Sequence, residues 1–311
     1  MSNFVVMGEC MVEFSPMSSG DYRQSFAGDI YNTAVYLKRL NGDDSQVSIL
    51  TGIGNDSLSE QMLTRFTSEQ LNIDLVQTVA DRILGAYLIN ISAEGERSFV
   101  YWRETSAAKR TLSFLSEDSR AQLLANTNTF YFSGISLAII EPEERELFWQ
   151  LLQDLQSSGV DIVFDSNYRP RLWQSQEDAI EQYEQALKYS NIVFAGVEDF
   201  ELLNGFNSYQ QISLYLSSYE IDELIIKNGA QGVMCLYDNE QDLVAVTPVK
   251  QVVDSTSAGD SFNAGYLSAR SKGQSVVEAV KLGCKVSGLV IQHKGAIVAA
   301  PVFSDFMLNL K

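Results

Sequence analysis

Short apolar runs that alternate with longer amphipathic segments are the feature that most constrains how this chain of 311 residues folds. The apolar runs lie at residues 4–7, 47–50, 130–132, 161–164, 192–194 and 224–226. Runs of this length and character are typical of parallel strands that are buried on both faces. The alternation of strand and helix therefore predicts an α/β fold, in which helices flank a mainly parallel sheet on both sides.

Two of the intervening segments have clear helical spacing. Residues 144–156 carry apolar side chains at intervals of three and four, namely Phe148, Leu151, Leu152 and Leu155. The segment 277–291 places five small or apolar side chains on one helix face, namely Val277, Val280, Cys284, Gly288 and Ile291. Such spacing predicts amphipathic helices, each with one face suited to packing against a core.

Residues 84–103 break this alternation. Two segments of alternating polarity flank the turn-like residues 93–96, which predicts a β-hairpin. In its second strand Phe99, Tyr101 and Arg103 share one face, because side chains alternate with period two. The hairpin is either a solvated edge or a lid over a ligand site. No repeat or linker marks a boundary, so we expect residues 1–311 to form one domain.

Composition excludes several classes of function. The 40 acidic residues against 22 basic ones give a formal charge of −18, which disfavours nonspecific binding to nucleic acid or anionic membrane. The three cysteines are scattered, so a disulfide framework is not expected. The first residues lack a signal sequence, and no apolar run approaches the ~20 residues that span a bilayer. These features predict a soluble cytoplasmic protein.

The only histidine is His293, which excludes metal sites built from several histidines. A Ser-His-Asp arrangement remains formally open. His293 lies in the sequence Gln-His-Lys-Gly, and the chain has no nucleophile elbow. We therefore expect His293 to lie at the surface or behind a site.

Residues 252–262 are the most informative segment of the chain. Small residues precede a predicted helix at 262–270, so the first backbone N–H groups of the helix are unobstructed and form an anion site with the helix dipole. Asp260 lies in the first turn. It is either a helix cap or a base beside the anion site, and the local pattern leaves both open. The helix dipole predicts a low pKa for this carboxyl.

Two glycine-containing loops have simpler interpretations. Gly52, Gly54 and Asp56 lack the third glycine of a dinucleotide-binding loop and favour a tight strand-to-helix turn. Gly229 and Gly232 lie between two predicted strands and indicate a turn. Because glycine has no side chain, that turn would also let a nucleotide approach the backbone closely.

Three segments, in the right order, resemble the ribokinase-like (PfkB) family of sugar kinases. They are Asp-Ser-Thr-Ser-Ala-Gly-Asp at 254–260, Ala-Gly-Asp-Ile-Tyr-Asn at 27–32 and Gly-Ile-Gly-Asn-Asp at 52–56. Within the family the chain is most similar to the 2-keto-3-deoxygluconate kinases, through residues 8–11, 101–103, 133–138 and 164–173. The resemblance implies a three-layer sandwich with a small β-sheet lid formed by about residues 9–27 and 82–104.

The resemblance also implies an activity, which is ATP-dependent phosphorylation of 2-keto-3-deoxygluconate to its 6-phospho form, with Mg²⁺. Asp260 would be the base, next to an anion hole at Ser257, Ala258 and Gly259. The sugar acid would contact Gly28, Asn32, Tyr87, Tyr101, Arg103 and Arg169. The nucleotide would lie along Asn167, Lys227, Gly229, Gly232 and Gly259. A homodimer through the lid is expected, because an appended sheet has edges and an apolar face to cover.

Some positions depart from the family pattern. Ala27 and Ser255 replace Gly and Thr, and Ser257 replaces the Gly of the anion hole; if Ser257 adopts positive φ, the strain is about 1 kcal/mol. Glu198 stands where the family has an Asn linked to magnesium, which leaves the metal ligands unknown, with Glu201 as a candidate through water. Three alternatives stay open: a fructokinase or other kinase of a neutral sugar, a non-catalytic sugar-binding regulator, and a structural protein.

Overall fold

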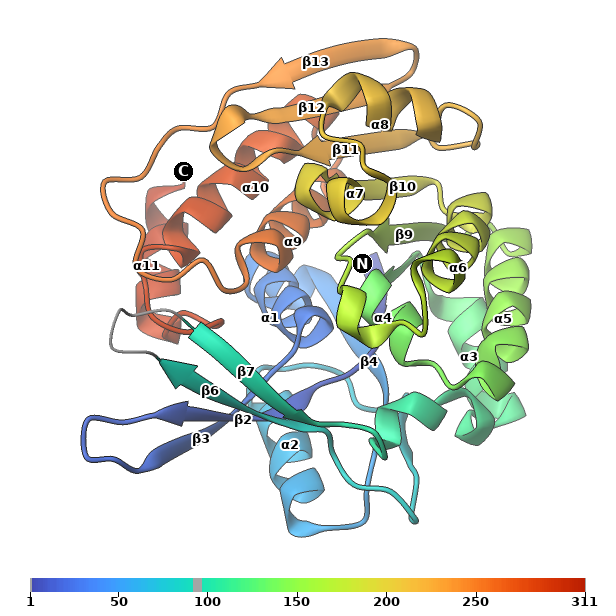
Figure 1. Ribbon diagram of the computed structural model, residues 1–311, viewed down its shortest axis with the longest axis vertical. Helices are drawn as coiled ribbons and strands as arrows, with labels where there is room; N and C mark the ends of the chain where they lie inside the picture. The colour runs from blue at the N-terminus through green and yellow to red at the C-terminus, as the bar shows by residue number, and fades with distance from the viewer. Residues whose placement is uncertain (1, 92–96, 311) are drawn as a thin grey trace.

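The computed structural model describes residues 2–91 and 97–310. They form two sheets, a large one that is covered by helices and a separate, smaller one (Figure 1). The order of the large sheet is β13-β12-β11-β10-β9-β8-β1-β4-β5. Its strands are β1 Ser2–Met7, β4 Ser45–Ile53, β5 Val76–Thr78, β8 Thr129–Ser133, β9 Asp161–Asp165, β10 Ile192–Gly196, β11 Glu223–Lys227, β12 Val233–Tyr237 and β13 Glu240–Val244. Pairing is parallel from β11 through to β5, whereas β12 and β13 are antiparallel. The predicted α/β fold is confirmed.

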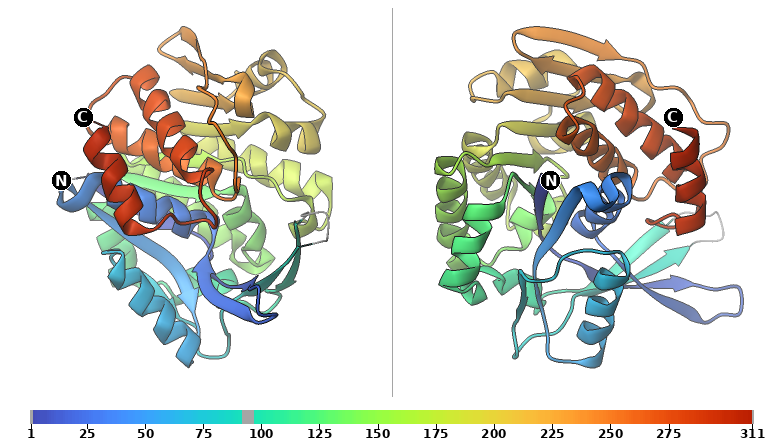
Figure 2. Two further views of the ribbon diagram at one scale, coloured as in Figure 1. Left: turned by 90° about the vertical axis from the view of Figure 1, so that its left-hand side faces the viewer. Right: turned by 180° about the vertical axis from the view of Figure 1, so that it is seen from behind.

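Helices cover both faces of this sheet and enclose a separate apolar core on each (Figure 2). One face is covered by α1 Asp29–Asn41, α2 Ser57–Ser68, α9 Ala258–Ser271, α10 Val276–Val290 and α11 Ala300–Asn309. The other is covered by α3 Glu117–Asn126, α4 Gly134–Ile139, α5 Arg145–Ser157, α6 Gln176–Tyr189, α7 Val197–Asn204 and α8 Tyr209–Leu216. Short 3₁₀ helices lie at Gly42–Asp44, Ala107–Arg110, Leu112–Phe114, Pro142–Glu144, Pro170–Leu172 and Gly229–Gln231.

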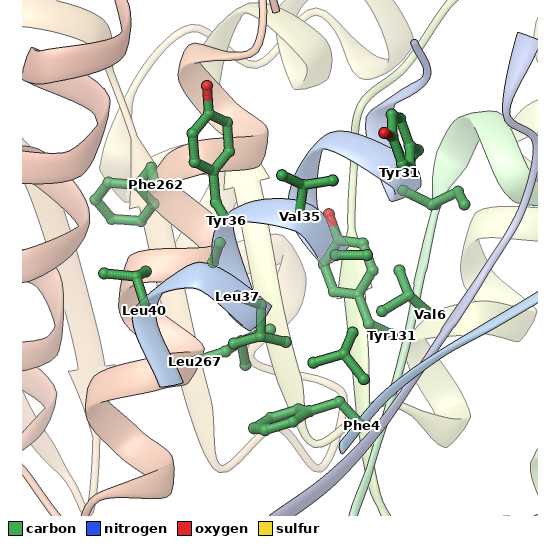
Figure 3. Close-up of a cluster of buried hydrophobic side chains, with 14 of the residues drawn as sticks. Phe4, Val6, Tyr31, Val35, Tyr36, Leu37, Leu40, Tyr131, Phe262 and Leu267 are labelled. Atoms are coloured by element: carbon green, nitrogen blue, oxygen red, sulfur yellow. The ribbon is translucent and has the colours of Figure 1, made fainter. Parts of the chain in front are cut away.

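Strand β1 shows why the apolar runs are continuous rather than alternating. Phe4 and Val6 point into the core that α1 and α9 cover, and Val5 and Met7 point into the opposite core. Figure 3 shows Phe4 and Val6 beside the apolar side chains of α1, with Phe262 and Leu267 approaching from α9. A strand buried on both faces needs apolar residues at every position.

Both predicted helices form, but the predicted face of the second differs from the buried one. In α10 the buried residues are Val276, Ala279, Val280, Gly283, Val286 and Val290. Val277, Cys284, Gly288 and Ile291 are only partly buried. The physical reason is a close contact between two glycines: a Cβ on Gly265 of α9 would lie 2.8 Å from the Cα of Gly283. The face of α10 that packs against α9 is therefore set by its small residues. The spacing of apolar residues alone does not identify that face.

The second sheet has the order β3-β2-β6-β7 and lies beside the N-terminus of α1 (Figures 1 and 2). Its strands are β2 Met11–Pro16, β3 Tyr22–Ala27, β6 Ala86–Ile91 and β7 Arg97–Trp102. Strands β6 and β7 pair antiparallel with Tyr87 opposite Tyr101, so the predicted hairpin pairing is confirmed. The turn predicted at 93–96 lies outside the described residues.

Candidate active site

Asp260 is a buried carboxylate in the first turn of α9, with 8% of its surface exposed. Asn32 Nδ2 on α1 donates a hydrogen bond to Asp260 Oδ2 at 2.8 Å, and Thr33 Oγ1 donates to the Asp260 carbonyl at 3.4 Å. The site thus joins the start of α9 to the first turns of α1. These two segments are more than 220 positions apart in the sequence, and only the fold brings them together.

The predicted low pKa of Asp260 is wrong. Burial, together with the neighbouring carboxyls of Asp29 and Asp165, raises the pKa of Asp260 to about 7, although the hydrogen bond from Asn32 and the nearby Ser257 side chain act to lower it. The helix dipole acts in the opposite direction, but its effect is about 1 kcal/mol near a helix end, less than the cost of burying a charge. Asp260 therefore titrates near neutral pH.

Ser257 precedes α9 and has a left-handed backbone conformation, with φ 66°. This is the positive φ for which the sequence analysis expected strain. Its hydroxyl is buried and has no hydrogen-bond partner among the described residues. The amide of Ala258 donates to the Ser255 carbonyl at 3.2 Å. The amides of Gly259 and Asp260 lie in the first turn, where no preceding helical carbonyl is available to accept from them.

Lys227 lies beneath this turn as part of a buried polar network. Its Nζ donates to Asp165 Oδ1 at 3.0 Å and to Asn263 Oδ1 at 3.1 Å. Asn263 Nδ2 in turn donates to the Tyr131 hydroxyl at 3.0 Å. A Cβ added to Gly259 would lie 3.7 Å from Lys227 Nζ, so this cation lies next to the anion site.

Asn167 follows β9 and also has a left-handed backbone, with φ 31°. Its side-chain amide donates to Asp29 Oδ2 at 3.1 Å, and the Ser133 hydroxyl donates to the same oxygen. Burial raises the pKa of Asp29, and the charge of Asp165 adds to that shift. Sequence reasoning did not select Asp29, although it lies inside the segment 27–32 that carries the family resemblance.

Residues 164–173, the longest segment that resembles the 2-keto-3-deoxygluconate kinases, are held by aromatic packing. Tyr168 and Trp173 both contact the ring of Tyr183 on α6, with ring centroids 5.9 and 5.8 Å apart. The Tyr183 hydroxyl donates to the Ser166 carbonyl. These buried aromatic contacts hold the loop that presents Asn167 and Arg169.

Arg169 is 54% exposed at the side chain and forms a loose ion pair with Asp199 Oδ1 at 3.5 Å. Its guanidinium also donates to the Tyr168 carbonyl at 2.8 Å. The nearby carboxylate of Asp165 is paired with Lys227. Arg103 is placed differently. It pairs with Glu9, which is 2% exposed and also accepts from the Ser106 hydroxyl.

Gly28 lies against the same segment as Glu9. A Cβ at Gly28 would come 2.4 Å from the Glu9 carbonyl oxygen, so no other residue fits without movement of the backbone. The Tyr87 hydroxyl donates to Glu13 of β2, and the rings of Tyr87 and Tyr101 are 5.8 Å apart. Burial raises the pKa of Tyr87 above its usual range, so the phenol stays protonated. Tyr101 itself is 49% exposed.

The turn after β11 contains Gly229 at φ 49° and Gly232 at φ 123°, both in the region that favours glycine. Gly232 packs against strand β13, where an added Cβ would lie 3.0 Å from the Val244 carbonyl. Beyond this contact is a hollow of about 750 Å³. One wall is formed by residues 242–245 and 247–249, and another by one side of α10, which includes Lys281, Cys284 and Gly288. Phe306 of α11 also lines the hollow.

Sequence reasoning missed this hollow. The sequence did hold a sign of the hollow. Cys284 and Gly288 belong to the helix face that was expected to pack against the core, and the structure leaves that face partly open.

The remaining residues considered from the sequence lie elsewhere. Glu201 is exposed on α7. His293 follows α10, and its ring Nδ1 lies 3.0 Å from the Leu289 carbonyl. No helix within residues 2–91 and 97–310 is long and apolar enough to cross a membrane.

Comparison with known proteins gives relatives over almost the whole chain. The model of the pfkB family of carbohydrate kinases matches residues 1–302. The 2-dehydro-3-deoxygluconokinase of Escherichia coli K12 is 38% identical over 297 residues, which cover 94% of this chain and 96% of that protein. The enzyme of the same name from Dickeya dadantii is 37% identical over 300 residues, covering 95% and 96%.

Solved structures share the fold at lower identity. A fructokinase with bound ATP from Xylella fastidiosa has a TM-score of 0.85 at 19% identity, covering 99% of this chain and 98% of that one. The 2-dehydro-3-deoxygluconokinase of Thermotoga maritima has a TM-score of 0.81 at 20% identity, covering 99% and 98%. The family match over residues 1–302, together with relatives at 37–38% identity, shows that this chain belongs to the pfkB family of carbohydrate kinases.

Proposed function

We propose that this chain is a 2-dehydro-3-deoxygluconokinase, which transfers the terminal phosphoryl group of ATP to the 6-hydroxyl of 2-keto-3-deoxygluconate. The observation that carries this proposal is the placement of Asp260. Its carboxylate is buried at the start of a helix and bound to Asn32 on the sugar side, while the preceding residue, Gly259, lies next to Lys227 on the phosphate side. The relatives of that name at 36–38% identity support the substrate.

In this mechanism Asp260 accepts the proton of the sugar hydroxyl as that oxygen attacks the phosphorus. A pKa of about 7 suits a general base at neutral pH. The transition state of phosphoryl transfer is loose, so most of the catalysis comes from positioning and from stabilising charge. The amides of Gly259 and Asp260 and the cation of Lys227 are the groups that stabilise the phosphoryl oxygens.

The sugar acid requires hydroxyl donors and acceptors and one cation. Asn32 Oδ1 is buried without a partner in the described part of the chain, and a buried acceptor of this kind fits a sugar hydroxyl. Arg169 is the exposed arginine whose ion pair is loose, and its planar guanidinium suits a carboxylate. Tyr87, Tyr101 and Gly28 complete the sugar side, while Arg103 shapes it through its pair with Glu9.

The nucleotide base occupies the hollow between residues 242–249 and α10. Three facts support this placement: the hollow is mainly apolar in lining, its wall continues along the chain into the anion site at 254–260, and Gly232 packs on the same wall. The phosphates then run past Gly229 and Asn167 toward Gly259. At Gly229 and Gly259 the phosphates can approach the backbone closely, because glycine has no side chain.

Magnesium enters with the nucleotide. Within the described residues, no group of three or more His, Cys, Asp or Glu is arranged to hold a metal ion. Mg²⁺ does not require such a group, because it keeps several waters and binds through substrate phosphates and one or two carboxylates. Bound with the nucleotide, Mg²⁺ would neutralise phosphate charge, and Glu201 is the candidate to contact it through water.

We also propose that the small sheet, built from β2, β3, β6 and β7, serves as the lid of the site and pairs two protomers. Val100 and Trp102 share the face opposite Tyr101 and are 43% and 56% exposed. Burial of such side chains against a second copy would remove apolar surface from water. The cytoplasm is the proposed compartment, because ATP is the donor and all three cysteines are free.

An ADP-release assay tests the substrate. The purified protein is given MgATP with 2-keto-3-deoxygluconate, its galacto epimer, fructose, ribose or gluconate, and kcat/KM is compared. We expect the highest value for 2-keto-3-deoxygluconate and no release with Asp260→Asn. A higher value for fructose or ribose would assign a neutral-sugar kinase instead, and ADP release with none of the five would overturn the proposal.

A further inference from the structure

Asp29 is a carboxylate of the site to which the proposed mechanism assigns no role. It begins α1 directly after Gly28, and its Oδ2 accepts hydrogen bonds from the Ser133 hydroxyl and from Asn167 Nδ2 at 3.1 Å. Ser133 ends β8, and Asn167 follows the neighbouring strand β9. One carboxylate oxygen thus connects α1 to the ends of two adjacent strands.

The same face of α1 also contacts the base. Asp29, Asn32 and Thr33 are spaced by three and four residues, so they lie on one side of the helix. Asn32 Nδ2 donates to the Asp260 carboxylate at 2.8 Å, and Thr33 Oγ1 donates to the Asp260 carbonyl at 3.4 Å. The first two turns of α1 therefore connect the loop on the nucleotide side with Asp260.

We propose that Asp29 is a positioning residue for phosphoryl transfer, which orients Asn167 on the nucleotide side and places a negative charge beside Asp260. This inference rests on the proposed kinase function. Its first part follows from the backbone of Asn167, whose φ of 31° is unfavourable for a residue with a side chain. Such a conformation persists only where neighbours hold it, and the hydrogen bond to Asp29 is a direct restraint.

The second part concerns charge. The groups around Asp260 include Asp29, Asn32, Thr33 and Tyr36 on α1, Tyr131 on β8, Asp165 on β9, and Ser257 before α9. Lys227 on β11 lies next to Gly259. Of the two carboxylates among them, Asp165 is paired with Lys227 at 3.0 Å, whereas Asp29 accepts only from neutral donors in the hydrogen bonds above. After burial, Asp29 is the largest cause that raises the pKa of Asp260. Removal of its charge should lower that pKa.

Three variants test these two parts. Asp29→Asn removes the charge but keeps a carbonyl oxygen that accepts from Ser133 and Asn167. Ser133→Ala keeps the charge and removes one of the two hydrogen bonds that fix the carboxylate. Asp43→Asn removes an exposed charge from the 3₁₀ helix Gly42–Asp44 and serves as the matched control.

For each variant, kcat and both KM values are measured from pH 5.5 to 8.5, and thermal melting is recorded. We expect Asp29→Asn to move the acidic limb of kcat/KM to lower pH by about half a pH unit or more. Its kcat at pH 8 should fall roughly tenfold or more, because the neutral oxygen accepts weaker hydrogen bonds than a carboxylate and holds Asn167 less firmly, and a misplaced substrate group costs that much in rate. Ser133→Ala should lower kcat with the acidic limb unchanged, and Asp43→Asn should match the wild type.

Two results would overturn the inference. One is an Asp29→Asn variant whose pH profile and kcat equal those of the wild type. The other is a lower melting temperature with an unchanged profile, which would show a structural role only. Should Asp29→Asn fail to fold, an unaltered kcat in Ser133→Ala would contradict the orienting role by itself. Failure of the proposed function is distinct, since the wild type would then phosphorylate none of the sugars.

Discussion

Asp260 illustrates how two local effects compete at a single residue. Its place in the first turn of α9 favours the charged form, because the helix dipole is positive at that end. Its burial, and the nearby carboxylates of Asp29 and Asp165, favour the neutral form. The effect of burial is the larger one, so the pKa of the carboxyl is raised to a value that suits a base. As a consequence, the charged form of Asp260 lowers the free energy of unfolding.

The pH dependence of stability follows from that pKa. A carboxyl whose folded pKa is raised stabilises the fold below its unfolded pKa of about 3.9, and this contribution is lost as the pH rises to about 7. Asp260→Asn removes the titration. We therefore expect the variant to be inactive yet more stable than the wild type at pH 8, by up to about 4 kcal/mol, and nearly equal to it at pH 4.

Urea denaturation at both pH values measures this difference, with ligands left out of the buffer. Asp43→Asn again provides the control, because Asp43 is exposed. A stability gain that is the same at pH 4 and pH 8 would contradict the raised pKa of Asp260.

The arginines Arg103 and Arg169 should differ in what their removal costs. Arg103→Ala leaves the buried Glu9 carboxylate without its cation, so we expect a loss of about 3–5 kcal/mol in the free energy of unfolding. Arg169 is half exposed and loosely paired, so Arg169→Ala should change stability by less than about 0.5 kcal/mol. It should instead raise the KM of the sugar acid about tenfold or more.

Chemical denaturation and steady-state kinetics separate the two effects. If Arg169→Ala raised the KM of a neutral sugar as much as that of the acid, the proposed carboxylate contact would be wrong.

At the scale of elements, helices α1, α9 and α10 build the site from one side of the sheet. Helix α1 supplies Asn32, α9 supplies Asp260, and α10 forms a wall of the hollow. Close packing of Gly265 against Gly283 joins α9 to α10. This contact turns Cys284 and Gly288 away from the core and toward the hollow.

A larger side chain at Gly288 tests whether the hollow binds the nucleotide base. Gly288→Leu extends a side chain toward Val249 and reduces the space available for a nucleotide base, so we expect the KM of ATP to rise several-fold with the KM of the sugar acid unchanged. Gly288→Ala is the matched control, because its Cβ would make an ordinary contact with Val249 Cγ1 at 3.4 Å. An equal KM for ATP in both variants would place the base elsewhere. Initial-rate kinetics with each substrate varied in turn measures the difference.

At the scale of the whole molecule, the charge of −18 opposes the binding of two anionic substrates. The cations near the site are few, and Lys227 and Arg103 are already paired with buried carboxylates. In the proposed mechanism, Arg169 and a magnesium ion carried by the nucleotide provide the charge that the substrates need. A net charge of −18 disfavours nonspecific binding to nucleic acids and anionic membranes, which is consistent with the small-molecule substrates that we propose.

The assembly can be tested through the exposed face of the small sheet. Trp102→Asp places a charge where we propose that two protomers pack, so the variant should be a monomer at concentrations at which the wild type is a dimer. Leu214→Asp on α8 is the control, since this residue is 77% exposed on a different element. Light scattering coupled to gel filtration measures the masses. A wild type that is itself monomeric at micromolar concentration would contradict the proposed dimer.

The sequence by itself determined the fold class and singled out Asp260 as a candidate base. Apolar runs without alternation are typical of strands buried on both faces, and a helix start rich in small residues favours an anion site. These are local properties, so the local pattern carries them. The antiparallel hairpin of β6 and β7 was also predictable for this reason.

Tertiary structure alone decided which groups share the site and how they titrate. Asn32, Asp29 and Asp165 reach Asp260 from distant parts of the chain, and their charges and burial reverse the pKa that its helix position implies. The pairing of Arg103 with Glu9, and the open face of α10, likewise depend on packing between elements. Burial and electrostatic coupling act through space, and neither can be obtained from the order of residues along the chain.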